Sequence, residues 1–149
     1  MASIHEYPIT VTWYGAREGS GKCLAERSGT VVDISVPPEF QGPGNGTNPE
    51  ELLTSAIASC YSITFGIMAG MRKLAYTGLE TKAQGFVSQE GANFVFTKVV
   101  LQPKITLAEG ATDNDRAIAS DLAHKADLYC IITNAVRGKV AIEVVPTVV

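Results

Sequence analysis

Residues 47–71 read TNPEELLTSAIASCYSITFGIMAGM, and the last 20 of them, Leu52–Met71, carry no charge. Asn48 is a residue type that caps the free N–H groups of a helix, and Pro49 suits the first helical position. The two acids that follow favour the positive end of the helix dipole. This stretch therefore predicts a buried helix that begins after Asn48 and presents the thiol of Cys60 near its middle.

The same stretch is long enough to cross a bilayer, so a membrane-spanning helix is the alternative. Its hydroxyl side chains and the absence of flanking aromatic belts argue against that alternative. The rest of the chain has the pattern of amphipathic strands, which need an apolar helix to pack against. We predict a central helix in the protein core, and no membrane partner.

The composition is that of one globular domain over residues 1–149. Hydrophobic residues make up 46% of the chain and charged residues only 18%, which is low for a small monomer. We therefore expect apolar surface to be buried against a second copy of the chain. A net charge of -3 gives no electrostatic reason to expect a nucleic-acid partner.

The N-terminal residues lack the basic start and apolar run of a secretory signal, which predicts a cytoplasmic protein. Three cysteines without tight spacing do not form a disulfide framework of the secreted kind. No CxxC or HxxxH spacing indicates zinc, so His5 and His124 are predicted to be surface residues.

Alternating apolar residues and turn sequences predict an α+β fold with a mainly antiparallel sheet. A two-residue hairpin is expected at Ser28-Gly29, and Pro103 is expected at a sheet edge or a bulge. The predicted strands cover residues 4–14, 22–27, 30–36, 79–89, 93–106 and 140–148. A second helix, capped by Thr112, is predicted over residues 112–128, and a short turn over residues 130–136.

Cys60 is a candidate nucleophile, although a free cysteine is more often a buried apolar residue of the core. A reactive cysteine needs a lowered pKa. Cys60 lies 12 positions beyond Asn48, too far for the dipole of its own helix to lower that pKa. A nearby cation, best an arginine, is therefore expected to do so.

Two longer motifs carry a family resemblance. The stretch NGTNPEELLTSAIASCYSITFGIMA (residues 45–69) resembles the first-cysteine motif of the OsmC/Ohr superfamily, the osmotically inducible protein C and organic hydroperoxide resistance proteins. The stretch AHKADLYCIITNAVRGKVAIEV (residues 123–144) resembles the second-cysteine motif. The two motifs stand in the same order as in that superfamily, and the resemblance extends over the whole chain.

The resemblance implies a thiol-dependent peroxidase that reduces organic hydroperoxides and works as an intertwined homodimer, its sheet wrapped around the central helix. It implies that Cys60 is the peroxidatic cysteine and Cys130 the resolving one. Glu50 matches the active-site glutamate, and Arg17 in GAREG resembles the active-site arginine of the Ohr branch. A dithiol, such as a lipoyl-type dithiol, is the implied reductant, and no cofactor is implied.

The chain departs from the superfamily pattern in two places. Ile131 follows Cys130 where the motif usually has proline, so the local turn is expected to differ. Residues 36–47, from which the OsmC branch draws its arginine, contain none. The branch therefore stays open, and Arg27 and Arg137 are the next candidates should Arg17 not be the active-site arginine. Cys23 matches no motif and is expected to be structural.

The separation of Glu50 and Cys60 predicts how the site is assembled. Ten residues on one helix rise about 15 Å, further than a glutamate side chain reaches. No proline or glycine between them favours a break. We therefore expect each Glu50 to serve the Cys60 of a partner subunit. A non-catalytic binding or structural protein with inert thiols is the alternative function.

Overall fold

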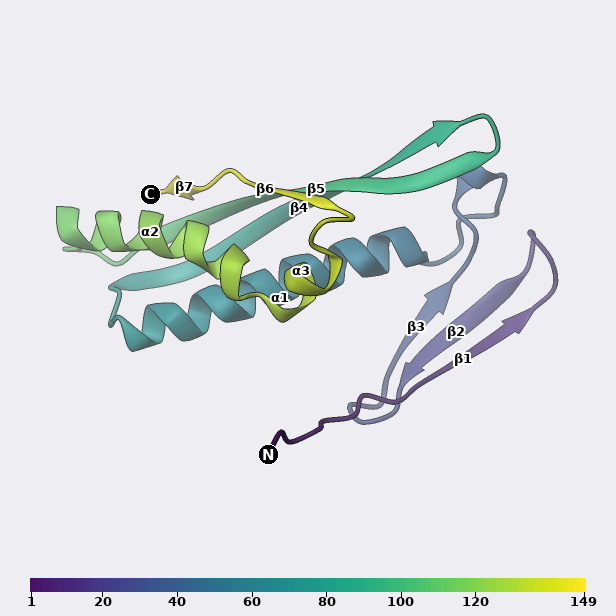
Figure 1. The fold of residues 1–149 in the computed structure, drawn as a ribbon, viewed down its shortest axis with the longest axis horizontal. Helices are drawn as coiled ribbons and strands as arrows, with labels where there is room; N and C mark the ends of the chain where they lie inside the picture. Colours follow the sequence, from purple (N-terminus) through teal and green to yellow (C-terminus); the bar gives the residue numbers. More distant parts are fainter. The chain divides into compact units, whose positions relative to one another are not determined.

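The computed structural model describes every residue from Met1 to Val149 and confirms the α+β class. The chain forms two compact units, Met1–Leu52 and Leu53–Val149 (Figure 1). The helix α1 (Pro49–Met71) begins in the first unit and belongs mostly to the second. The two units are described separately below.

The first unit is an antiparallel meander followed by one turn of 3-10 helix, η1 (Pro38–Phe40). Its strands pair in the order β1-β2-β3 and cover Ile9–Tyr14, Ser20–Ala25 and Thr30–Ile34. The predicted two-residue hairpin at Ser28-Gly29 is wrong. Ala25 pairs with Thr30, so the loop has the four residues 26–29, and the N–H of Gly29 donates to the Ala25 carbonyl at 2.8 Å.

The predicted start of α1 is confirmed. The backbone N–H of Glu51 donates to Asn48 Oδ1 at 2.8 Å, which is the contact that a capping side chain makes with the third helical residue. Asn48 Nδ2 donates in return to Glu51 Oε1 at 2.9 Å. From Pro49 the helix continues to Met71 without a break, as its sequence predicts.

The second unit is built on one long hairpin. Strands β4 (Tyr76–Glu90) and β5 (Asn93–Leu107) are antiparallel, with Glu90 paired to Asn93 at the predicted turn. The C-terminal segment forms two short strands, β6 (Ala141–Val144) and β7 (Thr147–Val148), which both run parallel to β5. The sheet is therefore mixed, and β5 is its interior strand.

Pro103 does not lie at an edge or a bulge, so that prediction is wrong. It pairs with Thr81 in the interior strand β5, and the register shifts of the hairpin lie elsewhere. Residues 98–101 of β5 pair with β6 and residues 104–105 pair with β7, so Pro103 falls in the gap between those two strands. A residue without an N–H is tolerated there because no strand lies opposite to accept a hydrogen bond.

Helices α2 (Asp113–Tyr129) and α3 (Ile131–Val136) complete the second unit. Thr112 caps α2 as predicted, with a capping box to Asp115. Buried side chains from α1, α2 and β5 form one core, in which the buried positions of each helix recur every three to four residues. The core includes Ile57, Tyr61, Phe65 and Ala69 of α1, Ala119, Leu122, Ala123 and Ala126 of α2, and Val99, Leu101 and Ile105 of β5.

In this single chain α1 is buried along one stripe only, so the prediction of a buried helix holds for one face. Ile63, Ile67 and Met71 on the other face are 61–79% exposed. By length and composition alone α1 could cross a membrane. One such helix is weak evidence, because core helices of soluble proteins pass the same test.

Candidate active site

Two of the four predicted site residues meet in the second unit. Cys60 lies half-buried on α1, and Cys130 is fully buried at the junction of α2 and α3. A hydrogen bond joins the two thiols. Both cysteines are in the free form, as is Cys23. Two residues 70 positions apart in the sequence are thus within direct reach of each other.

The first turn of α3 divides its backbone N–H groups between the two sulfur atoms. Cys130 is the N-cap of α3, and its Sγ accepts a hydrogen bond from the N–H of Thr133 at 3.3 Å. The N–H groups of Ile131 and Ile132 donate to Cys60. These N–H groups have no carbonyl partner within the helix, because the first turn of a helix leaves them free.

The surroundings of Cys60 favour its thiolate. Burial alone would raise the pKa of the Cys60 thiol, but hydrogen bonds to the sulfur outweigh burial and hold the pKa below its ordinary value. The donors are the thiol of Cys130, the N–H groups of Ile132 and Ile131, and the hydroxyl of Thr64. All of these donors are neutral. Within the second unit, therefore, hydrogen bonds lower the pKa, and not the cation that the sequence led us to expect.

The surroundings of Cys130 have the opposite effect. Burial and the hydrogen bond to Cys60 raise the pKa of the Cys130 thiol, and the hydrogen bond from Thr133 only partly offsets this. The site thus holds one sulfur that ionises readily and one that keeps its proton. This is the difference needed if one sulfur is to attack an electrophile while the other waits as a thiol.

A network of polar side chains holds α3 against the end of α2. Arg137 Nη2 donates to the Asp127 carbonyl at 3.1 Å and lies 3.5 Å from Asp127 Oδ1, an ion pair without a hydrogen bond. Arg137 Nε donates to Asn134 Oδ1 at 3.0 Å, and Asn134 Nδ2 donates to the Leu128 carbonyl at 3.0 Å. These contacts bracket Cys130 on both sides and fix the turn that carries it.

A tyrosine next to Cys60 ties α1 to α2. The hydroxyl of Tyr61 donates to the Ala123 carbonyl at 2.5 Å. Burial, together with the nearby Asp127 carboxylate, raises the pKa of Tyr61 well above its ordinary value. Tyr61 is therefore a neutral donor in the core, and it fixes the register between the helices that carry the two cysteines.

The other two predicted site residues belong to the first unit. Arg17, in the loop between β1 and β2, donates from Nη1 to Gln41 Oε1 at 3.0 Å. Glu50 is half-buried in the first turn of α1. The structure thus brings Cys60 and Cys130 together, whereas the roles of Arg17 and Glu50 in the site stay predictions.

The two alternative arginines have other partners. Arg27 donates to the Glu6 carbonyl at 3.1 Å and lies over the ring of Tyr7, with its guanidinium carbon 4.8 Å from the ring centroid. Arg137 is part of the network around the α3 turn. Neither set of contacts assigns these two side chains to substrate binding.

Sequence reasoning missed the donors at the start of α3. The sequence after Cys130 predicts only a short turn, and such a turn gives no reason to expect the N–H groups of Ile131 and Ile132 near Cys60. Thr133, whose N–H binds the capping sulfur, was missed for the same reason. The available indication was a run of seven residues without glycine or proline between Cys130 and Gly138.

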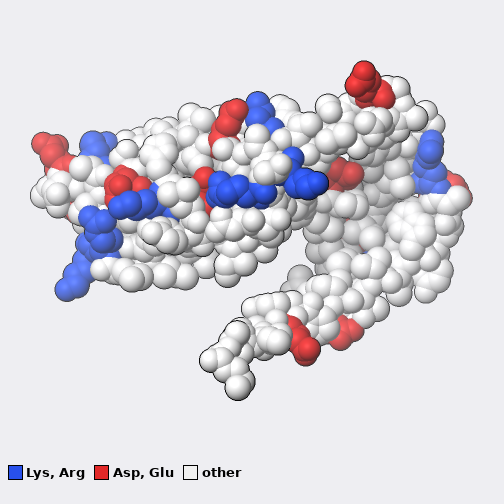
Figure 2. Space-filling model, in the orientation of Figure 1, with Lys and Arg blue, Asp and Glu red and all other residues white.

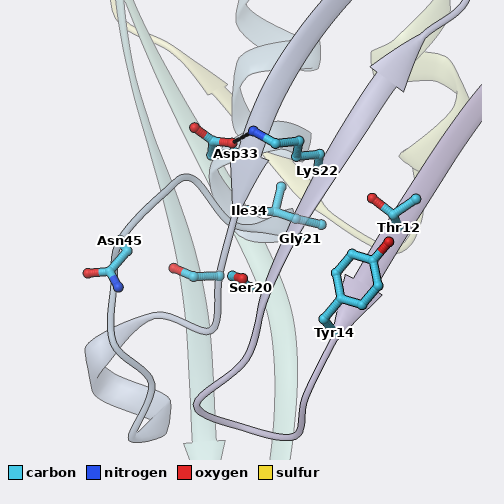
Figure 3. Close-up of a pocket in the computed structure, with 9 residues that line it drawn as sticks. Thr12, Tyr14, Ser20, Gly21, Lys22, Asp33, Ile34 and Asn45 are labelled. Atoms are coloured by element: carbon cyan, nitrogen blue, oxygen red, sulfur yellow. Dashed lines mark hydrogen bonds and ion pairs between the residues drawn. The ribbon is translucent and has the colours of Figure 1, made fainter.

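A separate pocket of about 230 Å³ lies on the meander of the first unit (Figure 3). Its lining includes Lys22 and Asp33, which form an ion pair with 2.5 Å between Nζ and Oδ1. Its lining contains neither Cys23, which is half-buried in β2, nor any predicted site residue. No group of histidine, cysteine or acidic residues is arranged to hold a metal ion, and His5 and His124 are exposed as predicted.

Comparisons with known proteins agree on one family. The profile of the OsmC-like protein family matches residues 42–145. The uncharacterized protein YmaD of Bacillus subtilis (strain 168) is 33% identical over 139 residues, which cover 93% of this chain and 91% of that protein.

More distant relatives extend the comparison. An organic hydroperoxide resistance protein of Xanthomonas axonopodis pv. citri is 27% identical over 136 residues, covering 90% of this chain and 89% of that protein. A crystal structure from Legionella pneumophila, described as an organic hydroperoxide resistance protein OsmC, superposes with a TM-score of 0.74. It is 23% identical, and the match covers 97% of this chain and 99% of that chain, so this likeness shows the fold alone. The chain therefore belongs to the OsmC-like protein family, within the OsmC/Ohr superfamily.

Proposed function

We propose that this protein is a thiol-dependent peroxidase that reduces organic hydroperoxides through Cys60 and Cys130. The observation that carries the proposal is the hydrogen-bonded pair of thiols, in which the Cys60 pKa is lowered and the Cys130 pKa is raised. An inert structural cysteine in an apolar core would have a raised pKa. The lowered pKa of Cys60 therefore disfavours a non-catalytic role. The name of the Xanthomonas relative supports organic hydroperoxides as the substrate class.

The reaction proceeds in three steps. The Cys60 thiolate attacks the distal oxygen of the hydroperoxide, the O–O bond breaks, and the departing alkoxide takes up a proton to leave as an alcohol. Cys60 is now a sulfenic acid. The sulfur of Cys130 attacks the Cys60 sulfur, the S–O bond breaks, and water leaves as the disulfide forms. A dithiol then reduces the disulfide by thiol–disulfide exchange.

Arg17 and Glu50 are proposed to complete the site from a partner subunit. The guanidinium of Arg17 would stabilise the charge that develops on the peroxide, and Glu50 would hold that guanidinium in place. Because α1 is continuous, Glu50 lies about 15 Å along the helix from Cys60 of its own chain. A homodimer that brings Glu50 to the partner's Cys60 resolves this separation. A cytoplasmic location supplies the reducing environment that free thiols need.

A steady-state peroxidase assay with a dithiol reductant tests the proposal. We expect a bulky organic hydroperoxide to be reduced faster than hydrogen peroxide, because the Xanthomonas relative is named for resistance to organic hydroperoxides. The variant Cys60→Ser should be inactive. Without the dithiol, the variant Cys130→Ser should consume about one equivalent of peroxide and stop as the sulfenic acid, and a second equivalent should oxidise it further to the sulfinic acid. Turnover by Cys60→Ser at the wild-type rate would refute the assignment.

A further inference from the structure

Cys130 lies in the turn between α2 and α3, and its placement depends on how firmly these two helices are joined. Its N–H bonds back to the Asp127 carbonyl at 3.4 Å, which is long for a hydrogen bond. Its Sγ accepts a hydrogen bond from the N–H of Thr133 at 3.3 Å, so the sulfur is tied to α3. α3 has only six residues, and a helix this short is not stable through its own hydrogen bonds. Contacts with other elements must therefore hold α3, and with it the sulfur, in place.

The end of α2 is firmly attached to the helix that carries Cys60. Ala123 of α2 is fully buried, and its carbonyl accepts a hydrogen bond at 2.5 Å from Tyr61, the neighbour of Cys60. α3 packs on the same core through the partly buried Ile132 and Val136. Apolar packing is not directional, so it does not by itself fix the orientation of α3 relative to α2.

Arg137 supplies directional contacts between α3 and α2. Its Nη2 donates to the Asp127 carbonyl at 3.1 Å and lies 3.5 Å from Asp127 Oδ1. Its Nε donates to Asn134 Oδ1 at 3.0 Å, and Asn134 Nδ2 donates to the Leu128 carbonyl at 3.0 Å. One guanidinium thus joins a residue that precedes Cys130 to a residue that follows it. We call this set of contacts the Arg137 bridge.

We propose that Arg137 is a positioning residue, whose bridge holds the Cys130 sulfur where it attacks the Cys60 sulfenic acid before a second hydroperoxide does. The inference rests on the proposed peroxidase function and names the contact that protects this site from over-oxidation. The bonds of Arg137 go to groups of the turn, so it acts through the placement of Cys130. This role differs from that of an active-site arginine, which would bind the peroxide itself.

Two reactions compete for the Cys60 sulfenic acid. In the first, the Cys130 sulfur attacks the Cys60 sulfur, the S–O bond breaks, and the hydroxyl takes the thiol proton and leaves as water. In the second, the sulfenic sulfur attacks the distal oxygen of another hydroperoxide, the O–O bond breaks, and an alcohol leaves as the sulfinic acid forms. Only the first reaction depends on the position of Cys130, and a displacement of about 1 Å can slow such a reaction roughly a hundredfold. A looser turn therefore favours the sulfinic acid without slowing formation of the sulfenic acid.

The variant Arg137→Lys tests the bridge while it keeps the charge. Lysine retains a cation beside the Asp127 carboxylate, but its ammonium group lacks the planar fork that reaches two acceptors on opposite sides of the turn. Arg116→Lys is the matched control. Arg116 lies on α2 and also donates to a backbone carbonyl, that of Val148 at 2.8 Å, but its bond does not cross the Cys130 turn. Circular dichroism checks that both variants fold.

The readout is the hydroperoxide concentration at which half of the chains end as the sulfinic acid. Reduced protein is mixed with a series of tert-butyl hydroperoxide concentrations without a dithiol, and the products are identified by intact mass. We expect this concentration to fall roughly tenfold in Arg137→Lys, because disulfide formation is slower, and to keep its wild-type value in Arg116→Lys. The rate at which the Cys60 thiol is lost should be the same in all three proteins.

Two results would overturn the proposal. A wild-type half-point in folded Arg137→Lys would show that the bridge supports the fold without placing Cys130 for reaction. A slower loss of the Cys60 thiol in Arg137→Lys would show that the arginine acts on the peroxide. Should Arg137→Lys not fold, Asn134→Ala removes one end of the bridge at an exposed position, and the same half-point decides.

An equilibrium with glutathione separates failure of this proposal from failure of the peroxidase function. If the wild type consumes no hydroperoxide, the peroxidase function is wrong, and the placement of Cys130 is tested without peroxide. One oxidised glutathione then converts the two thiols to the Cys60–Cys130 disulfide and yields two reduced glutathiones. Arg137→Lys should need a roughly tenfold more oxidising ratio to form half of the disulfide, since its thiols are held together less firmly. Equal midpoints in the wild type and Arg137→Lys would overturn the proposal.

Discussion

At the residue scale, the two thiols differ in acidity because they have different hydrogen-bond partners. Cys60 receives hydrogen bonds from the first turn of α3, from Thr64 and from Cys130. Cys130 is more deeply buried and gives its proton toward Cys60. The spacing of the cysteines in the sequence does not predict this difference in pKa. It arises only when the end of α2 and the start of α3 meet the middle of α1.

This difference predicts the pH dependence of alkylation. A thiol ionises as the pH rises through its pKa, so a lowered pKa shifts the thiolate of Cys60 to lower pH, and a raised pKa shifts that of Cys130 to higher pH. Short pulses of iodoacetamide at increasing pH should label Cys60 first. In Cys130→Ala the Cys60 profile should move to higher pH, because one donor is lost. An unchanged profile would show that Cys130 does not stabilise the thiolate.

Arg17 is the second prediction at this scale. Arg17 already donates to Gln41, which restricts its guanidinium. Lysine keeps the positive charge of arginine but lacks the planar set of N–H donors of the guanidinium. We therefore expect Arg17→Lys to lower kcat/KM for an organic hydroperoxide by roughly ten- to hundredfold. Arg27→Lys is the matched control and should retain activity, since Arg27 contacts Glu6 and Tyr7. If Arg17→Ala reduces peroxides as fast as the wild type, the arginine is misassigned.

At the element scale, α1 approaches the hairpin closely at one glycine. A Cβ on Gly85 of β4 would lie 2.3 Å from Thr54 Oγ1 and 2.8 Å from Phe96 Cζ. At Gly78, in the same strand, a Cβ would meet nothing within 4 Å. We expect Gly85→Ala to lower the free energy of unfolding by about 1–3 kcal/mol through overcrowding. Gly78→Ala should change it far less, and equal urea midpoints for the two variants would contradict this packing.

The elements also show what the sequence could predict. The capping residues Asn48 and Thr112 located the starts of both long helices, because a cap is a local interaction between neighbours in the chain. The environment of Pro103 could not be predicted, since the gap between β6 and β7 depends on strands that follow some 40 residues later. The N–H donors of α3 were missed because their acceptor lies on α1, far away in the sequence.

At the scale of the whole molecule, apolar side chains remain exposed to solvent in each unit. On α1 it includes Ile63 and Ile67, and on β1 it includes Ile9 and Val11, which are 54% and 56% exposed. The face shown in Figure 2 carries interspersed charges over the second unit and few over the meander. Exposed apolar side chains in this number favour burial against another copy of the chain.

The corresponding prediction is an obligate homodimer with two composite sites. Light scattering should give twice the chain mass of 15.8 kDa. Co-refolding Cys60→Ser with Glu50→Ala should restore activity that neither variant has alone, because a heterodimer has one site with both defects and one with neither. A fully active monomer would rule out the composite site.

The most direct test of the central claim, that Cys60 and Cys130 act as a redox pair, is a count of free thiols after a single turnover. The reduced chain has three cysteines. One equivalent of an organic hydroperoxide should leave one free thiol, at Cys23, and a disulfide-linked peptide that contains Cys60 and Cys130. A dithiol should restore all three thiols. Three free thiols with the hydroperoxide unconsumed, or a disulfide that includes Cys23, would contradict the claim.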